Sequence, residues 1–304
     1  MEYEKTYLPL VLQKKKNYVG VKYEMDSTRW KLDFKGIAVK RRDSCNFTKE
    51  VFWSVIYPSL GLQETVTTGG KTKVAKASFS LEQGPDAAIK ALRIKLDKLA
   101  KGTIDTEDLY IYKSIKSEYK GPDCPLCCGS GKGFEDGKEC SKCFGRGKII
   151  NLPHVQLADR MRKRDPGSAP VSGQRFPYIV VHEDQRSLDL NQCTEDPAYA
   201  RRMGIPPDYI WYLNNQVRKP VSKFLRIVGK EDATDKEFAK TEARLYEIRA
   251  RRRREKADAV KMVFFDKSNK RPGAVVPLKP PKKRTTTLAE QSKSSKKITD
   301  FFKK

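Results

Sequence analysis

The hydrophobic and polar pattern at the start of the chain predicts strands. Residues 7–13, 17–25 and 35–41 are rich in β-branched and aromatic side chains, and charged turn residues separate them. Short runs of this composition are typical of strands in a sheet. We therefore expect the first 43 residues to form a small β-sheet.

Two helices follow in the pattern. Residues 46–61 predict a helix with Asn46 or Thr48 as its N-cap. A second helix is expected over residues 84–102, because Pro85 suits a first turn and Gly102 suits a helix end. Its apolar side chains recur at spacings of three, four and three residues, which places them on one face: Ile89, Leu92, Leu96 and Leu99.

The second half of the chain reads as mostly helical, with few strands. Strands are predicted at 106–116 and 175–183, and helices at 152–164, 196–204, 206–228 and 235–260. Pro220 should kink or break the third of these helices. From Asp266 the chain is rich in Lys, Pro, Ser and Thr, which indicates a disordered basic tail. The pattern as a whole predicts an α+β fold.

The charge of the chain points to a polyanionic partner. Its 304 residues carry 63 Lys and Arg against 38 Asp and Glu, a formal net charge of +25. Such an excess favours nucleic acid through the release of counterions. A membrane surface is a second candidate, but the sequence has no long apolar span and no lipidation signal, so we expect no membrane partner. Solubility alone is the plain alternative.

Residues 124–148 contain the frame Cys-x-x-Cys-x-Gly-x-Gly twice. Two Cys-x-x-Cys turns separated by twelve residues supply four sulfurs, which suits one tetrahedral Zn²⁺. The predicted ligands are Cys124, Cys127, Cys140 and Cys143. Cys128 has no counterpart in the second repeat. Two disulfides or free thiols are the alternatives, although the lack of a secretion signal favours a reducing compartment.

The doubled frame resembles half of the zinc domain of DnaJ-type chaperones. The His-Pro-Asp motif of the chaperone J-domain is absent from this sequence, so the resemblance does not imply a chaperone or adaptor. With no histidine among the four ligands and no open ligand position, the zinc is expected to be structural. The module then serves as a staple, as a docking surface, or as an added contact to DNA.

Three stretches carry a more specific resemblance. Residues 15–24 with 35–43, then 152–181, then 195–221, resemble in order the C-terminal third of family B DNA polymerases. The delta-type enzymes of eukaryotes and of large DNA viruses are the most similar. The resemblance covers residues 1–230.

The resemblance implies a division of the chain into parts. Residues 1–43 would be the C-terminal strands of the polymerase palm, followed by a mostly helical thumb at 44–120 and 151–265. The cysteine module at 121–150 would be a small zinc-bound insertion within the thumb. Residues 266–304 would be the disordered tail.

The resemblance also implies contacts with primer–template duplex DNA. The matching positions are Lys15, Lys16, Tyr18, Lys35, Gly36, Arg41, Arg42, His154, Arg160, Arg175, Tyr178, Tyr212 and Gln216. Asn17 stands where the family often has Arg, and Gln174 where it tends to have Asp. Lys and Arg bind phosphates without reading sequence, as a polymerase requires. For each of them taken alone, a solvated surface charge is the alternative.

Features needed for polymerisation are missing from the sequence. The family holds two Mg²⁺ ions with palm carboxylates, and neither of its two carboxylate motifs occurs here; Asp-x-Asp occurs nowhere. We expect a chain that binds duplex but does not copy it alone, with Mg²⁺ only in the assembled polymerase. A split gene would place the exonuclease, fingers and catalytic palm on another chain; a truncated gene model is the alternative. A non-catalytic zinc-containing DNA-binding accessory protein is the other function considered.

The last residues, SKKITDFFKK, resemble the peptide that binds the sliding clamp PCNA. The resemblance assigns the apolar plug to Ile298, Phe301 and Phe302, while Ser295 replaces the usual Gln. An accidental apolar end is the alternative. We expect the chain in the nucleus or at a viral replication site. KPPKKR and Arg251 to Arg254 are either import signals or DNA-facing charge.

Overall fold

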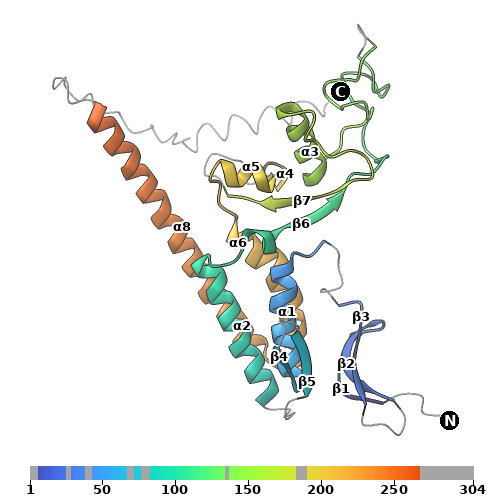
Figure 1. The fold of residues 1–304 in the computed structure, drawn as a ribbon, viewed down its shortest axis with the longest axis vertical. Helices are drawn as coiled ribbons and strands as arrows, with labels where there is room; N and C mark the ends of the chain where they lie inside the picture. The colour runs from blue at the N-terminus through green and yellow to red at the C-terminus, as the bar shows by residue number, and fades with distance from the viewer. Residues whose placement is uncertain are drawn as a thin grey trace, which may run out of the picture. The chain divides into compact units, whose positions relative to one another are not determined.

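The computed structural model describes residues 6–24, 29–37, 43–66, 72–76, 83–133, 137–182 and 190–267 (Figure 1). Contacts divide the chain after Arg251, and residues 1–251 form one compact unit, which holds the sites discussed below. Over the described ranges, no helix combines the length and apolar character needed to cross a bilayer.

The N-terminal strands form a three-stranded antiparallel sheet in the order β1-β2-β3: β1 is Thr6–Lys14, β2 is Asn17–Tyr23 and β3 is Trp30–Lys35. The buried side chains Val11, Val19 and Val21 belong to the hydrophobic core. The first two predicted strands are confirmed. The third prediction, at 35–41, misses the start of the strand: Trp30, Leu32 and Phe34 alternate with polar residues, and β3 runs from Trp30 to Lys35. Residues 38–41 of that prediction lie outside the described residues.

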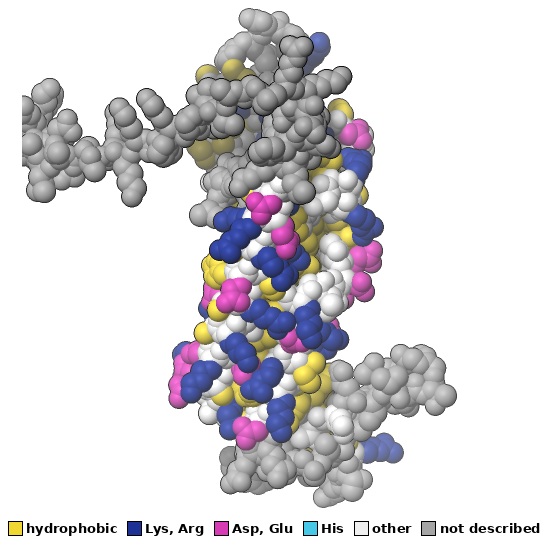
Figure 2. Space-filling view, turned by 90° about the vertical axis from the view of Figure 1, so that its left-hand side faces the viewer, with side chains coloured by type: hydrophobic (Ala, Val, Ile, Leu, Met, Phe, Trp, Pro, Cys, Tyr) yellow, Lys and Arg dark blue, Asp and Glu magenta, His cyan; other side chains and the backbone are white. Residues whose placement is uncertain are grey.

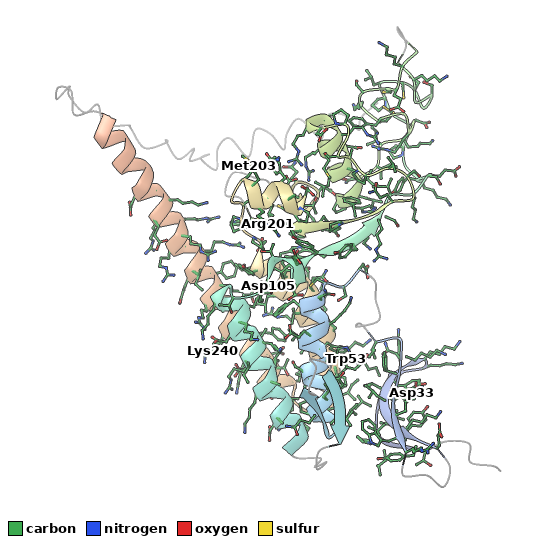
Figure 3. The ribbon with its side chains drawn as sticks, in the orientation of Figure 1. Asp33, Trp53, Asp105, Arg201, Met203 and Lys240 are labelled. Atoms are coloured by element: carbon green, nitrogen blue, oxygen red, sulfur yellow. The ribbon has the colours of Figure 1, made fainter. Side chains whose placement is uncertain are left out.

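The sheet contacts the first helix through aromatic side chains. Trp53 of helix α1, Asn46–Ser59, meets the ring of Phe34 edge to face at 5.1 Å and stacks on Tyr57 at 5.2 Å (Figure 3). The predicted N-caps of this helix are wrong. The N-cap is Cys45, whose Sγ lies 3.1 Å from Thr48 Oγ1, and no side chain caps the backbone N–H groups.

Helix α2, Gln83–Lys101, packs its predicted apolar stripe into the core, where Leu92, Leu96 and Leu99 are at most 1% exposed. Gly102 ends the helix with φ of +68°, as the sequence indicates. On the other side, α2 exchanges two ion pairs with helix α8, Glu231–Lys267: Arg93 with Glu237 and Arg244 with Asp97, both at 2.5 Å. On this face Lys and Arg predominate, with fewer Asp and Glu among them (Figure 2).

A second antiparallel sheet has the order β6-β7-β8, with β6 at Ile111–Ser114, β7 at Arg175–Val180 and β8 at Thr194–Glu195. The predicted strand at 106–116 is only partly strand, because Thr106–Leu109 forms the 3₁₀ helix η2. Ile111 pairs with Tyr178 and Ser114 with Arg175. The chain between β6 and β7 is therefore an excursion that leaves the sheet and returns to it.

Smaller elements complete the fold. Helix α3, Pro153–Arg164, starts at the predicted proline and lies within the excursion, beside the cysteine module. The others are the hairpin β4 (Leu62–Val66) and β5 (Thr72–Lys76), and the short helices α4 (Leu190–Cys193), α5 (Pro197–Arg202) and α6 (Tyr209–Trp211).

The predicted helix at 206–228 is divided. It comprises α6, a π-helical segment η3 at Tyr212–Arg218, and helix α7 at Lys219–Ile227. Pro220 lies where the π-helical segment passes into α7, and the backbone stays helical on its N-terminal side, so the predicted break does not occur there. Helix α8 includes Asp266, where the tail was predicted to begin, and ends at Lys267. The rest of that tail, with Ile298, Phe301 and Phe302, lies outside the described residues.

Tyr212 joins three parts of the core. Its side chain is fully buried, and its hydroxyl donates to the Leu109 carbonyl at 2.8 Å while accepting from the Val180 N–H at 3.0 Å. Burial holds the pKa of this phenol well above its usual range, so the hydroxyl keeps the proton that it donates. Leu109 precedes β6 and Val180 ends β7, so this one group fixes η3 against the sheet.

Replacing Tyr212 with Phe should lower the free energy of unfolding by about 2 kcal/mol, because it leaves a buried carbonyl and a buried N–H without partners. Urea denaturation checks this. Tyr246→Phe is the matched control, since Tyr246 is 52% exposed. Equal midpoints for the two variants would contradict the buried role of the hydroxyl.

Candidate nucleic-acid interface and metal centre

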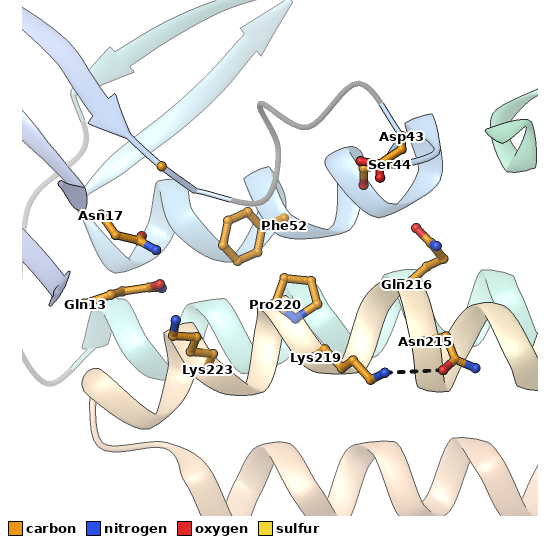
Figure 4. A pocket seen from close by; sticks show the side chains of 11 residues that line it. Gln13, Asn17, Asp43, Ser44, Phe52, Asn215, Gln216, Lys219, Pro220 and Lys223 are labelled. Atoms are coloured by element: carbon orange, nitrogen blue, oxygen red, sulfur yellow. Dashed lines mark hydrogen bonds between the residues drawn. The ribbon is translucent and has the colours of Figure 1, made fainter. Parts of the chain in front are cut away.

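A cleft of about 470 Å³ opens between the N-terminal sheet and the helices (Figure 4). Gln13, Asn17 and Gly36 line it from the sheet side. The helical side is contributed by α1, η3 and α7: Phe52, Asn215, Gln216, Lys219, Pro220 and Lys223. The cleft is thus lined by residues that are far apart in the sequence, at positions 13–52 and 215–223.

The cleft carries unbalanced positive charge. Lys219 and Lys223 are exposed on its helical side, and Lys219 Nζ donates to Asn215 Oδ1 at 3.4 Å. Asp43 is the single acid among the described residues that line the cleft. Its Oδ2 lies 2.9 Å from Lys113 Nζ, and this ion pair neutralises it. The lining therefore favours an anion.

Predicted duplex contacts flank this cleft. Lys15 and Lys16 are exposed in the turn between β1 and β2, and Lys35 is exposed at the end of β3. Gly36 follows with φ of +66°, and a Cβ there would lie 2.4 Å from the Lys16 carbonyl oxygen. A glycine is thus required for the end of β3 to lie against the turn, which brings the three lysines together.

Tyr18 and Asn17, which follow this turn, differ in their side-chain hydrogen bonds. Tyr18 and Tyr7 both donate to Asp33 Oδ2, at 3.1 and 2.7 Å, and the bond from Tyr7 is the main reason that the pKa of Asp33 falls below its usual range. Asn17 Oδ1 is buried without a hydrogen-bond partner. Tyr18 is thus committed to the sheet, whereas Asn17 leaves an acceptor at the edge of the cleft.

The predicted contacts from the second half of the chain are mostly internal. Arg160 donates to the carbonyls of Asn191 and Thr194 at 2.7 and 2.5 Å, so it ties α3 to the chain leading into β8. Tyr178 is 8% exposed, and Tyr212 is fully buried. In this fold the side chains of these two tyrosines are almost inaccessible to a duplex. The family motifs that contain them therefore reflect packing of the core.

Arg175 and His154 complete the predicted set. Arg175 is exposed at the first position of β7, and its Nη2 lies 3.4 Å from the Tyr112 carbonyl. Burial, and then Lys113 and Lys116, lower the pKa of His154, so this imidazole is neutral at pH 7. Arg41 and Arg42 lie outside the described residues. Among the described predicted contacts, Gly36 and Gln216 line one cleft, and Lys15, Lys16 and Lys35 flank it. The others do not line it: Tyr18, His154, Arg160, Arg175, Tyr178 and Tyr212.

Sequence reasoning missed Lys219 and Lys223. Their spacing of four residues puts them on one face of α7, a signal that was available in the sequence. This signal is masked by Pro220, which lies between the two lysines and suggests that the helix breaks there.

The four predicted ligand cysteines form one cluster. Their Sγ atoms all lie within 4.8 Å of one another, with 3.9 Å between Cys124 and Cys140 and 3.7 Å between Cys127 and Cys143. All four side chains are buried, whereas Cys128 is exposed. A tetrahedral Zn²⁺ with Zn–S bonds of about 2.3 Å needs sulfurs about 3.8 Å apart, so the residues fit this ion.

The two repeats of the module close each other symmetrically. The Cys124 N–H donates to the Gly147 carbonyl at 2.8 Å, and the Cys140 N–H donates to the Gly131 carbonyl at 2.9 Å. Gly131 and Gly147 have φ of +77° and +69°, and a Cβ on either would fall within 2.4 Å of a carbonyl of the other repeat. Their N–H groups each donate to a cluster sulfur at 3.3 Å.

The thiols of the cluster perturb one another's ionisation. Burial raises the pKa of Cys127, but the Gly131 N–H and the other three sulfurs lower it, to about 7. Burial and the sulfurs of Cys127, Cys140 and Cys124 raise the pKa of Cys143 to about 12, although the Gly147 N–H acts in the opposite direction. Because ionising one thiol opposes ionising the next, only a cation can hold four thiolates together. Zn²⁺ would fill that structural role through Cys124, Cys127, Cys140 and Cys143.

Comparison with known proteins identifies the family. The family model for DNA polymerase family B matches residues 1–127 and 137–228. This chain belongs to DNA polymerase family B. The break between the two matched segments lies inside the cysteine module.

Viral and delta-type polymerases are among its relatives. The chain is 33% identical over 229 residues to a DNA polymerase of Pyramimonas orientalis virus, covering 75% of this chain and 15% of that protein. It is 28% identical over 284 residues to a DNA polymerase of Acanthamoeba polyphaga mimivirus, covering 91% and 13%. The DNA polymerase delta catalytic subunit of Schizosaccharomyces pombe is 28% identical over 235 residues, covering 77% and 17%.

Among solved structures, the family B polymerase of the archaeon Pyrobaculum calidifontis aligns with a TM-score of 0.45 at 18% identity, over 71% of this chain and 21% of that one. The chain spans less than a fifth of the length of the curated relatives named above.

The metal prediction is tested by changing one ligand and its non-ligand neighbour. Purified protein should contain about one Zn²⁺ per chain by elemental mass spectrometry. Cys124→Ser should lose it, because three sulfurs cannot complete the tetrahedron. Cys128→Ser should keep it, because Cys128 lies outside the cluster. Equal zinc in both variants would contradict the assignment of the ligands.

Proposed function

We propose that this chain is the C-terminal palm and thumb part of a family B DNA polymerase that grips the primer–template duplex during DNA replication. The observation that carries the proposal is the lysine-flanked cleft. It brings together Gly36 and Gln216, which belong to two separate family motifs. Lys15, Lys16 and Lys35 flank the cleft, and Lys219 and Lys223 line it.

The proposed parts follow the family. Residues 1–43 are palm strands, 44–120 with 151–265 are thumb, and 121–150 are a zinc-binding insertion. The excursion between β6 and β7 supports the insertion, because the sheet closes at its base without the module. The chain would act in the nucleus or at a viral replication site, in a reducing compartment.

Catalysis is proposed to need the rest of the polymerase on another polypeptide. Both carboxylate motifs that hold Mg²⁺ in the family are missing from the sequence, and the acid lining the cleft is paired with Lys113. A partner carrying the exonuclease, fingers and catalytic palm would supply them. The competing function, a non-catalytic zinc-containing DNA-binding accessory protein, predicts no such partner. Copurification with a palm-bearing chain distinguishes the two.

Duplex binding is tested through the cleft lysines. The purified chain should bind a primer–template hairpin with steep salt dependence and incorporate no nucleotide. Lys219→Gln/Lys223→Gln should reduce the slope of log affinity against log salt by about 2, because each phosphate contact contributes about 1. Fluorescence anisotropy at several salt concentrations measures this.

The matched control removes the same charge from α2. Lys90→Gln/Lys98→Gln changes two exposed lysines outside the cleft lining and should leave the slope unchanged. Equal losses in the two double variants would refute the cleft as the duplex site. Nucleotide incorporation by the chain alone would refute the need for a catalytic partner.

We further propose that the C-terminal peptide tethers the chain to the sliding clamp PCNA. Support comes from the sequence: Ile298, Phe301 and Phe302 have the spacing of the clamp-binding peptide and end a basic tail. Aromatic anchors of this kind dominate the energy of small interfaces.

Phe301→Ala/Phe302→Ala should abolish capture by immobilised clamp. Lys303→Ala/Lys304→Ala is the control, because it keeps both aromatic rings. Undiminished capture of the aromatic variant would remove the tether from the proposal.

A further inference from the structure

The two repeats of the cysteine module differ at the x positions that follow the second cysteine of the Cys-x-x-Cys-x-Gly-x-Gly frame. Where the first repeat has Cys128 and Ser130, the second has Phe144 and Arg146. Phe144 has φ of +51° and its counterpart Cys128 has φ of +48°, so the left-handed turn after the second cysteine belongs to the frame of both repeats. What differs between the repeats is the side chain that this turn presents.

Cations surround the ring of Phe144. Arg146, Arg162 and Lys163 lie 5.9, 5.3 and 5.9 Å from its centroid. Arg162 and Lys163 come from α3, so the ring stands where the module meets this helix. The side chain is partly exposed. These cations lie over the ring, so a base would stack on Phe144 in their place while their charges turn to the neighbouring phosphates.

A groove of about 370 Å³ runs between the module and α3, lined by Phe144 with Lys142, Arg146 and Lys163 among others. Arg146 donates two hydrogen bonds, of 2.9 and 2.6 Å, to Asp159, which is the one acid among the described residues that line the groove. Lys142 and Lys163 have no ion-pair partner within the described ranges of the chain. The groove therefore offers two unneutralised lysines beside the ring.

We propose that this groove binds single-stranded nucleic acid, with one base stacked on Phe144 and the neighbouring phosphates on Lys142 and Lys163. A single strand is favoured over a duplex because only an unpaired base exposes its face to an aromatic side chain. No base-specific donor set is required, so the site tolerates any sequence. This site is separate from the lysine-flanked cleft and does not depend on the proposed grip on duplex.

The experiment uses the full zinc-loaded chain with two fluorescent probes, an oligothymidine strand and a hairpin duplex. Phe144→Asn should weaken oligothymidine binding roughly tenfold, since stacking on one aromatic side chain contributes about that much. It should leave hairpin binding unchanged. Asn tolerates the left-handed backbone, so the variant removes the ring while the module stays folded. Zinc content verifies the fold.

Charge is tested with a matched pair of double variants. Lys142→Gln/Lys163→Gln should lower oligothymidine affinity and its salt slope. Lys120→Gln/Lys132→Gln removes the same charge from exposed positions outside the groove lining and should do neither. Conversely, Lys219→Gln/Lys223→Gln should lower the affinity for the hairpin and leave the affinity for oligothymidine unchanged. The proposals for the two sites can therefore be refuted independently.

A tryptophan at position 144 reports stacking directly. Phe144→Trp should show emission that oligothymidine quenches, beyond any change in the parent protein with its three tryptophans. Unchanged oligothymidine affinity in Phe144→Asn, or an unquenched Phe144→Trp at saturation, would overturn the proposal. Equal losses for both probes would assign the groove to duplex instead.

Discussion

The buried hydroxyl of Tyr212 is the constraint on which the arrangement of both candidate sites depends. It bonds at once to the carbonyl before β6 and to the N–H that ends β7. The π-helical segment that carries Tyr212 continues into α7, which lines the cleft, while β6 and β7 close the base of the excursion that holds the cysteine module. One phenol hydroxyl with both of its hydrogen bonds made therefore fixes the helices of the cleft and the strands beneath the cysteine module to the same core.

The net charge of +25 is distributed unevenly, and its distribution matters more than its size. Between α2 and α8, Arg93 and Arg244 are paired with Glu237 and Asp97, which lowers the positive charge there without cancelling it, because Lys98 and Lys240 line the same groove. The described linings of the cleft and of the module groove hold one acid each. There the acids Asp43 and Asp159 are held by Lys113 and Arg146, and neighbouring lysines are left to meet an anion.

The helices and the cysteine cluster were predictable because their signals are local. A 3–4 spacing fixed the buried face of α2, and the Cys-x-x-Cys pairs fixed the four sulfurs. The alternation of Trp30, Leu32 and Phe34 with polar residues is a local signal for β3, but the apolar run at 35–41 competes with it. The N-cap of α1 was not predictable, because Cys45 begins the helix with an extended backbone and without a capping side-chain hydrogen bond. Tyr212 shows the same limit at the site. Its motif marks the family, but a motif does not say whether a tyrosine faces DNA or fills the core.

The reciprocal backbone bonds between the two cysteine repeats have a consequence for how the module can change. Each repeat supplies the carbonyl that the other needs, so neither half is a complete folding unit. Bonds outside the cysteines and glycines add to this closure, since the Ile149 N–H donates to the Pro122 carbonyl at 2.9 Å and Lys148 pairs with Asp123. Arg146 is turned away from the other repeat and bonds to Asp159 of α3. A change at Arg146 would therefore alter the surface that the module shares with α3 and leave the bonds between the repeats intact.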